Sequence, residues 1–321
     1  MKAVLVGLLL LIAWTTGIAQ SLSFKFGTPF QRSDLDVRWN VPSNGVPDRV
    51  WVYRLFPNHF SSATMEFLRS LGPFTDQDRV RSNSNEVLFI KSSRLPNLFV
   101  SYRFGQIRYQ TATPTFTNLV KNVPPVAESA ALALSFFNIV GIKSSDLTKK
   151  DNGSPDLSLS VSSTEYYVNH QVLTNIESDI VDFRRCVDGG EWVGAETGGD
   201  GQVQFGEYGK PSRIWLSWRK IQRYESYQTA SSSTIMSWIR HGRAVQNMIP
   251  MDAEPINWGT IKSLTITKAK LCYYAGAPSS PSDWLTPFIA LWTTVDRGHG
   301  KIEVEIDCPI IDMTKPPLPA K

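Results

Sequence analysis

The spacing of apolar residues predicts one order of elements three times along the chain, a short amphipathic helix followed by antiparallel strands. The last copy is the clearest. Ile235–Val245 has helical spacing after the capping run Ser231–Ser233, and Ile261–Ile311 alternates apolar and polar residues as a meander of strands does. The three copies share this order but no sequence, so they indicate a structural repeat.

Two further helices are predicted upstream. Val126–Val140 places large apolar residues on one side and alanines on the other, and Gly141 follows in the position where helices commonly end. Ser61-Ser62 offers a cap for a helix that runs to Leu71, where a glycine and a proline follow. Each helix begins one copy of the repeat.

Alternating runs rich in β-branched and aromatic residues predict the strands of each copy. They are Val50–Leu55, Glu86–Lys91, Leu98–Phe104 and Ile107–Gln110 in the first; Tyr166–Val172, Ile180–Cys186, Val203–Gly206 and Arg213–Ile221 in the second; and Ile261–Ala269, Lys270–Tyr274, Trp284–Thr294 and Lys301–Asp307 in the third. This order predicts an α+β fold of tandem cystatin-like modules, each a helix packed on an antiparallel sheet. We place the modules at 20–115, 124–222 and 231–312, before a flexible proline-rich tail at 313–321.

The first 19 residues predict a signal peptide. Met1-Lys2 is a short basic region, Val4–Trp14 is an apolar run, and Gly17-Ile18-Ala19 offers small residues for cleavage before Gln20. The apolar run is shorter than the roughly 20 residues that span a membrane, and no later segment approaches that length. A retained anchor is the alternative. The pattern favours a secreted or extracytoplasmic protein with no membrane span after the signal is removed.

The composition is that of a globular protein with a large core. Of the 321 residues, 42% are hydrophobic and 19% are charged, and the aromatic share of 11% is typical of half-buried antiparallel sheets. The net charge of +4 is spread along the chain without a block of lysine or arginine. This distribution argues against a nucleic-acid partner.

Three cysteines, Cys186, Cys272 and Cys308, lie in the C-terminal half of the chain. Cys272 and Cys308 lie on predicted strands of one sheet, so in an exported protein they are a candidate disulfide. The alternative is three buried thiols that pack as small apolar side chains. A catalytic cysteine is disfavoured because no histidine is marked as its partner.

No catalytic or cofactor motif accompanies the modules. HExxH, GxSxG, the P-loop, CxxC and GxGxxG do not occur in the required context, and the four histidines occur singly. We therefore expect no enzymatic activity, no cofactor and no metal. Asn152-Gly153-Ser154 is an N-glycosylation sequon, which makes Asn152 a candidate glycosylation site in a eukaryotic source.

Acidic residues and glycines gather in a loop predicted at 188–201, with Asp188, Glu191, Glu196 and Asp200 as its carboxylates. Two kinds of site are considered. Calcium requires several oxygen ligands, but the spacing fits no EF-hand. A carboxylate pair for glycoside hydrolysis requires a separation that sequence does not define. A solvated loop is therefore the favoured interpretation.

Four tryptophans, Trp192, Trp215, Trp284 and Trp292, lie in or beside predicted strands and form a candidate binding surface. They are too many to face one core, and exposed aromatic side chains often mark contact with protein or carbohydrate. The alternative is that two modules bury them between their faces, because a chain of several modules needs apolar interfaces.

Segments of the second and third copies resemble a known family. The segments are Asp182–Arg185, Val203–Gly206, Ile214–Arg219, Leu271–Tyr274, Trp284–Trp292 and Ile302–Pro309. They resemble PepSY-like modules, which also occur in exported regulators of the YycH/YycI type and in protease propeptides. The resemblance covers roughly residues 125–312. The ending Cys308-Pro309-Ile310 and the glycine-rich insertion depart from the family pattern.

The resemblance implies binding and brings no catalytic residues: such modules modulate a peptidase or a surface signalling partner. We therefore expect an exported, non-enzymatic binding or regulatory protein whose partner is a peptidase or a surface receptor. Two alternatives stay open. One is a secreted carbohydrate-binding protein or glycoside-acting enzyme, and the other is a structural component of an envelope or matrix.

Overall fold

The structure is a computed structural model that describes residues 28–42, 46–91, 95–111, 119–168, 171–194, 198–248, 255–277, 280–298, 300–312 and 316–318. The predicted signal peptide lies outside the described residues. The chain forms two compact units. The central unit comprises Leu55–Ile221 with Ala277–Ser279, and the terminal unit comprises the rest. Among the described residues, no helix is long and apolar enough to cross a membrane.

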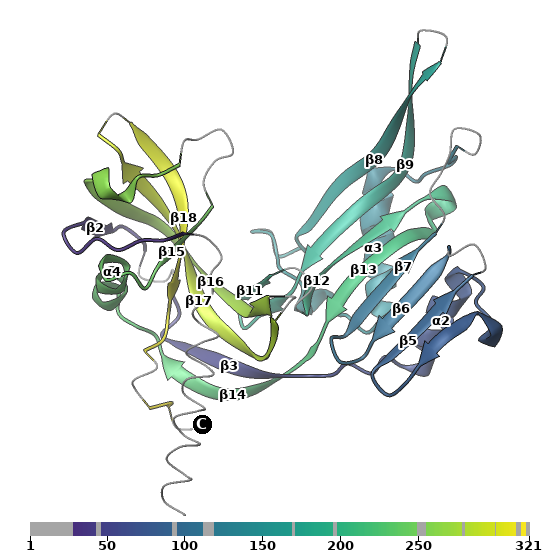
Figure 1. Cartoon of the computed structure of the whole chain (residues 1–321), viewed down its shortest axis with the longest axis horizontal. Coiled ribbons are helices and arrows are strands. Elements are labelled where there is room, and N and C mark those ends of the chain that lie inside the picture. The colour runs from purple at the N-terminus through teal and green to yellow at the C-terminus, as the bar shows by residue number, and fades with distance from the viewer. Residues whose placement is uncertain are drawn as a thin grey trace, which may run out of the picture. The chain divides into compact units, whose positions relative to one another are not determined.

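The central unit contains one antiparallel sheet of eight strands, in the order β4-β5-β6-β7-β13-β12-β9-β8 (Figure 1). Its elements are α2 (Ser62–Leu71), β4 (Arg79–Ser82), β5 (Glu86–Ile90), β6 (Asn97–Ser101), β7 (Gln106–Gln110), α3 (Val126–Ile139), β8 (Leu157–Val168), β9 (Gln171–Arg184), β12 (Gly199–Phe205) and β13 (Pro211–Trp218). A small hairpin of β10 (Cys186–Val187) and β11 (Gly190–Val193) lies between β9 and β12 in the sequence.

The order of elements repeats within this sheet. A helix precedes four meandering strands in α2-β4-β5-β6-β7, and again in α3-β8-β9-β12-β13. The last strands of the two meanders, β7 and β13, pair with each other antiparallel in the middle of the sheet. Residues from the predicted modules at 20–115 and 124–222 therefore share one sheet. The module boundaries themselves stay a prediction.

Both helices pack on the same face of the sheet, over alternate residues of each strand. The shared core contains Leu68 of α2, Phe136 and Phe137 of α3, and inward-facing strand residues such as Val100 and Phe183. In β9, for example, Val181 and Phe183 are buried, while Asp182 and Arg184, which alternate with them, are not. This period of two assigns every second side chain to the opposite face, which we call the distal face.

The helix ends follow the sequence signals. The Ser61 hydroxyl accepts a hydrogen bond from the Thr64 amide over 3.0 Å and so satisfies one free donor of the first turn of α2. Helix α3 ends at Ile139, and Gly141 beyond it has a φ of +84°, a conformation that glycine adopts at little cost. The helices predicted at 62–71 and 126–140 are confirmed.

The predicted strand Tyr166–Val172 is wrong in its bounds. Strand β8 ends at Val168 and β9 begins at Gln171, so the segment spans a hairpin between two long strands. The first part of β8 was not predicted, because serine and threonine alternate with its apolar residues. Such a strand has a weak hydrophobic signal, although its period of two is regular.

The terminal unit contains one curled mixed sheet and helix α4 (Ser232–Arg240). Its strands are β1 (Thr28–Pro29), β2 (Asp36–Trp39), β3 (Arg49–Phe56), β14 (Lys220–Gln228), β15 (Val245–Met248), β16 (Ser263–Ala277), β17 (Ser280–Asp296) and β18 (Lys301–Pro309). Strands β15-β18-β17-β16 lie in that order, and β2 runs parallel to β16. Strands β3 and β14 each continue across the boundary between the units in the sequence. The predicted α+β class is confirmed.

Two predictions in this unit are corrected. The helix predicted at 235–245 ends at Arg240, because Gly242 turns the chain at a φ of +77° and Val245 begins β15. The two strands predicted at 261–274 are one continuous strand, β16.

Asp307 lies in the middle of the terminal unit's sheet. Its backbone pairs with Val245 of β15 on one side and with Ala290 of β17 on the other. Among the described residues, no group forms a hydrogen bond with its buried Oδ1. Burial, and then the nearby Glu305 carboxylate, raise the pKa of Asp307 to about 7. The folded protein therefore holds this proton more tightly than the unfolded chain does.

This difference predicts how stability depends on pH. Between about pH 4 and pH 7 the native state binds the extra proton, so the free energy of unfolding falls as pH rises through this window. We expect Asp307→Asn to flatten that slope and to exceed the wild type at pH 8 by up to about 4 kcal/mol. Urea denaturation from pH 4 to pH 8 measures both values.

The matched control is Glu303→Gln, which replaces an exposed carboxylate on the same strand. The control is expected to keep the wild-type slope. An unchanged slope in Asp307→Asn contradicts the prediction.

Candidate functional site

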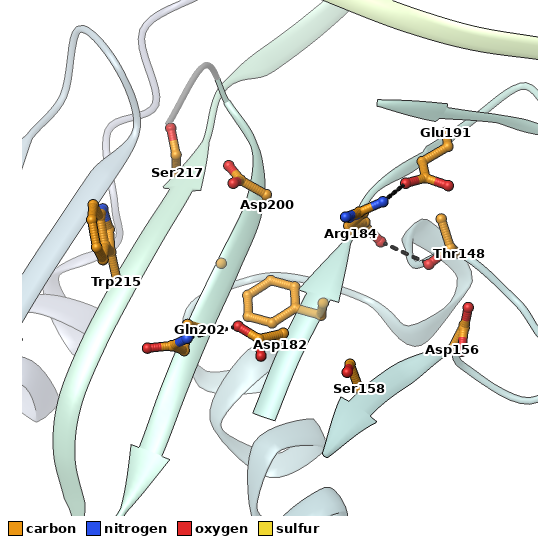
Figure 2. A pocket seen from close by; sticks show the side chains of 12 residues that line it. Thr148, Asp156, Ser158, Asp182, Arg184, Glu191, Asp200, Gln202, Trp215 and Ser217 are labelled. Atoms are coloured by element: carbon orange, nitrogen blue, oxygen red, sulfur yellow. Dashed lines mark hydrogen bonds and ion pairs between the residues drawn. The ribbon is translucent and has the colours of Figure 1, made fainter. Parts of the chain in front are cut away.

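The distal face of the central unit's sheet contains a cavity of about 700 Å³ (Figure 2). Strands β8, β9, β12 and β13 supply most of its lining, and residues beside the sheet complete it. The lining residues are Thr148, Asp156, Ser158, Asp182, Phe183, Arg184, Glu191, Asp200, Gly201, Gln202, Trp215 and Ser217. All of them belong to the central unit.

Strand register places the polar side chains in two rows across the sheet. In one row, Ser158, Asp182, Gln202 and Trp215 are successive cross-strand partners. In the next row, two residues along each strand, Arg184, Asp200 and Ser217 are partners. Cross-strand partners point to the same side of a sheet, so both rows face the cavity.

Carboxylates dominate the charge of the cavity. Asp156, Asp182, Glu191 and Asp200 line it, and among the described residues Arg184 is the one basic residue of the lining. The Arg184 guanidinium forms an ion pair with Glu191. Four carboxylates against one guanidinium give the described lining an acidic surplus, which attracts a cation.

Side-chain amides fix the geometry of the first row. The Gln202 amide donates to Asp182 Oδ1 over 2.8 Å (Figure 2). The Gln204 amide in turn donates to Gln202 Oε1 over 2.9 Å. This chain of hydrogen bonds orients the Asp182 carboxylate before any ligand binds, and such preorganisation lowers the entropy cost of binding.

Ser217 carries an unsatisfied polar group in the second row. Ser217 is only 2% exposed, and its hydroxyl has no hydrogen-bond partner among the described residues. A buried polar atom without a partner costs roughly 1–3 kcal/mol. Ser217 lies opposite Asp200 on the neighbouring strand and lines the cavity, so a ligand with a donor or acceptor there would satisfy it.

Trp215 lines one side of the cavity, and two arginine side chains of the same chain lie over its ring system. The guanidinium carbons of Arg108 and Arg213 lie 5.4 and 5.5 Å from the centre of its ring system. Arg108 is the cross-strand partner of Trp215 on β7. These cation–π contacts hold the indole in place, half-buried, beside the polar rows.

The glycine-rich acidic segment is more ordered than the predicted solvated loop. Its described residues include strand β11 and the start of β12, and Glu191 and Asp200 reach the cavity from these two strands. Asp188 lies in the exposed turn of the β10–β11 hairpin at a φ of 44°, and Glu196 lies outside the described residues. No group of three potential ligands for a metal ion occurs in the part of the chain that the structure describes.

The glycines of this segment make room for buried rings. A Cβ on Gly199 would lie 2.3 Å from the indole of Trp192, and a Cβ on Gly201 would lie 2.4 Å from the ring of Phe183. Trp192 is accordingly only 1% exposed, and the Arg185 guanidinium stacks over it at 5.6 Å. Its assignment to a binding surface is corrected: it packs inside the protein.

The other predicted tryptophans have different environments. Trp284 and Trp292 are half-buried on β17 of the terminal unit, where Trp284 contacts Tyr224 edge-on at 4.7 Å and Lys268 lies 5.0 Å over Trp292. Of the four, Trp215 is the one that lines the cavity of the central unit.

The candidate disulfide does not form, and all three cysteines are described as thiols. Cys272 lies on β16 and Cys308 on β18, with β17 between them. Two strand spacings amount to roughly 9.6 Å, whereas a disulfide needs Cα atoms within about 7 Å. Burial raises the pKa of the Cys308 thiol, so this side chain packs as a small apolar group.

The candidate glycosylation site lies in an exposed turn. Asn152 Oδ1 accepts hydrogen bonds from the Ser154 amide over 3.0 Å and from the Ser154 hydroxyl over 2.6 Å. The sequon is therefore accessible, and its modification stays a prediction.

Most of the cavity was not predicted from the sequence: of its twelve lining residues, Glu191, Asp200 and Trp215 were candidates. Asp156, Ser158 and Asp182 were not candidates, because they are separated in the sequence and belong to no catalytic or ligand-binding motif. A signal did exist for Asp182, which stands between the apolar Val181 and Phe183 and so must point away from the core. Strand register, which brings it beside Gln202, was the missing information.

No family model matches this chain, and no curated protein matches it either. Among solved structures, an uncharacterized protein from Eubacterium rectale ATCC 33656 is similar over 94% of this chain and 97% of its own, with 9% identity and a TM-score of 0.46. The Bacillus megaterium YpeB C-terminal domain is similar over 78% of this chain and 98% of its own, with 9% identity and a TM-score of 0.32. At these TM-scores the similarities carry no conclusion about function.

The stabilities of alanine variants distinguish the buried Trp192 from the half-buried Trp215. Trp192→Ala removes a buried ring and leaves a cavity, so we expect it to lower the free energy of unfolding by about 3–5 kcal/mol. Trp215→Ala truncates a half-buried side chain on the distal face and should cost less than about 1 kcal/mol. Denaturant unfolding of both variants measures the difference, and a loss in Trp192→Ala as small as the one expected for Trp215→Ala would show that Trp192 is not a packing residue.

Proposed function

We propose that this chain is an exported, non-enzymatic binding protein whose central unit holds a basic side chain of a protein partner in the distal-face cavity. The observation that carries the proposal is the lining, in which four carboxylates and an unsatisfied serine hydroxyl surround one guanidinium. A lysine or arginine of a partner would add positive charge beside these carboxylates and a hydrogen-bond donor for the Ser217 hydroxyl. Export rests on the predicted signal peptide.

The chemistry of the lining supports binding over catalysis. Ser158 and Ser217 offer hydroxyls, but among the described lining residues there is no histidine, lysine or cysteine to activate them. The carboxylates lie in rows fixed by strand register, and amides and Arg184 hold two of them. Such fixed groups suit the recognition of a ligand of defined charge.

We also propose that each half of the central unit is a cystatin-like module. In each half, one helix lies on one face of four meandering antiparallel strands. The PepSY-like resemblance of the sequence supports the same interpretation for the second half. It also suggests the class of partner, a peptidase or a cell-surface signalling protein.

A saccharide is the second candidate ligand. The row Ser158, Asp182, Gln202 and Trp215 places hydroxyl, carboxylate and amide groups beside an indole ring. This combination of groups suits a saccharide, because the C–H faces of a sugar pack on aromatic rings while its hydroxyls form hydrogen bonds with polar side chains. For this ligand Trp215, and not the charge of the cavity, would dominate affinity.

Binding measurements separate the two ligands. Titration calorimetry would compare a lysine-containing heptapeptide with its alanine and glutamate analogues, alongside a panel of soluble polysaccharides. We expect the lysine peptide to bind, and the double variant Asp182→Asn with Asp200→Asn to weaken it at least tenfold. Salt at 0.5 M should weaken it as well, since the attraction is electrostatic.

The control variant removes the same charge elsewhere in the central unit. Glu66→Gln with Asp151→Asn neutralises two exposed carboxylates outside the cavity and should leave binding unchanged. Equal binding of all three peptides would contradict the proposal. Polysaccharide binding that Trp215→Ala abolishes and the Asp182/Asp200 double variant does not would assign the cavity to a saccharide.

A further inference from the structure

The two edges of the eight-stranded sheet differ in how they are protected. Edge strand β4 has four residues, carries Arg79 and Arg81, and its register with β5 is irregular between them. Both arginines form ion pairs, Arg79 with Asp76 and Arg81 with Glu86. Shortness, charge and irregular pairing are the devices by which proteins prevent an edge from pairing with another chain.

Edge strand β8 has few of these devices. It has twelve residues, with no proline, lysine or arginine, and Glu165 is its single charge. It ends the sheet, so no other strand of the part of the chain that the structure describes lies beside its outer backbone groups. A bulge opposite Ser162 and Ser163 is its one irregularity. A long, nearly neutral edge of this kind is a template for another strand.

The hairpin of β8 and β9 also exposes apolar side chains on the side of the sheet where α2 and α3 pack. Leu159 pairs with the buried Val181, which fixes the side to which it points, and Val161, Tyr167, Val172 and Ile176 continue that side along the hairpin. These five side chains are between 39% and 79% exposed. The hairpin extends beyond the neighbouring strands (Figure 1), and the apolar stripe runs out along it, although Val161 and Ile176 at its base also line a pocket with residues 120–126.

We propose that β8 pairs antiparallel with β8 of a second copy of this chain, which joins two eight-stranded sheets across a two-fold axis. If the two-fold axis is perpendicular to the sheet, the faces that carry α2 and α3 lie on the same side of the joined sheet in both copies. The two apolar stripes then lie next to each other. The pairing adds to the proposed binding function and does not depend on it, because an edge contact leaves the distal face free.

The charge of β8 favours a second copy as the occupant. With Ser162 opposite itself, Glu165 lies opposite Leu159 and Val161 lies opposite Ser163, so no like charges meet. The single carboxylate in twelve residues also offers little to a strongly basic foreign strand. A neutral, Ser/Thr/Val-rich strand is its own complementary partner.

The mass of the purified chain in solution tests the proposal. Sedimentation velocity between 1 and 100 µM is expected to show a dimer that dissociates on dilution. Val161→Lys and Ser163→Lys, made separately, place ammonium groups at the centre of the pairing and should raise the dissociation constant at least tenfold. Both positions are exposed in the hairpin, and circular dichroism verifies that the variants remain folded.

The other edge supplies the matched control. Val80 is a 63% exposed valine on β4, so Val80→Lys adds the same charge to the edge that the proposal leaves unpaired and should not change the dimer. In addition, Ser162→Cys should form an interchain disulfide that peptide mapping locates at residue 162.

Three results would overturn the proposal. One is a wild-type chain that is monomeric at 100 µM. Another is a dimer that persists in both lysine variants on β8. The third is a dimer that Val80→Lys dissociates equally. A monomer that binds a synthetic β8 peptide would assign the edge to a foreign strand and would also overturn the dimer.

Discussion

The pairing of β7 with β13 is the interaction on which the central unit depends. Five successive pairs, from Gln106 with Ser217 to Gln110 with Arg213, join the last strands of two meanders that helix α3 separates in the sequence. Because the pairing is antiparallel and in register, the inward residues of both halves, such as Ile107 and Leu216, fall on one side. Both helices can then share one core.

The same pairing creates the distal face. Once the inward residues of the strands point toward the helices, the alternate residues must point away, and around the cavity these are polar or aromatic. The cavity lies where β9, β12 and β13 bring carboxylates, amides and Trp215 together. Its charge therefore follows from strand register, and Ser217 remains a buried hydroxyl whose partner the sheet does not supply.

Local signals in the sequence predicted local structure well. Capping serines and terminal glycines located α2 and α3, and the alternation of Ile214, Leu216 and Trp218 identified β13. Long-range pairing was not accessible, since nothing in the sequence shows that β7 meets β13 or that β17 separates Cys272 from Cys308. Trp192 illustrates the limit: its burial depends on the absence of a side chain at Gly199, seven residues along the chain, and no periodicity of the sequence indicates that the two pack together.

Native-state amide hydrogen exchange in increasing urea tests most directly whether β7 and β13 unite the two halves. If the pairing holds one cooperative core, the amides of both strands exchange through the same opening, with the same free energy and the same dependence on urea. The inward residues Tyr109 and Ile214, which are paired across the junction, are the natural reporters. Exchange of β7 at a lower urea concentration than β13, with a smaller urea dependence, would show two independent modules and would contradict the account.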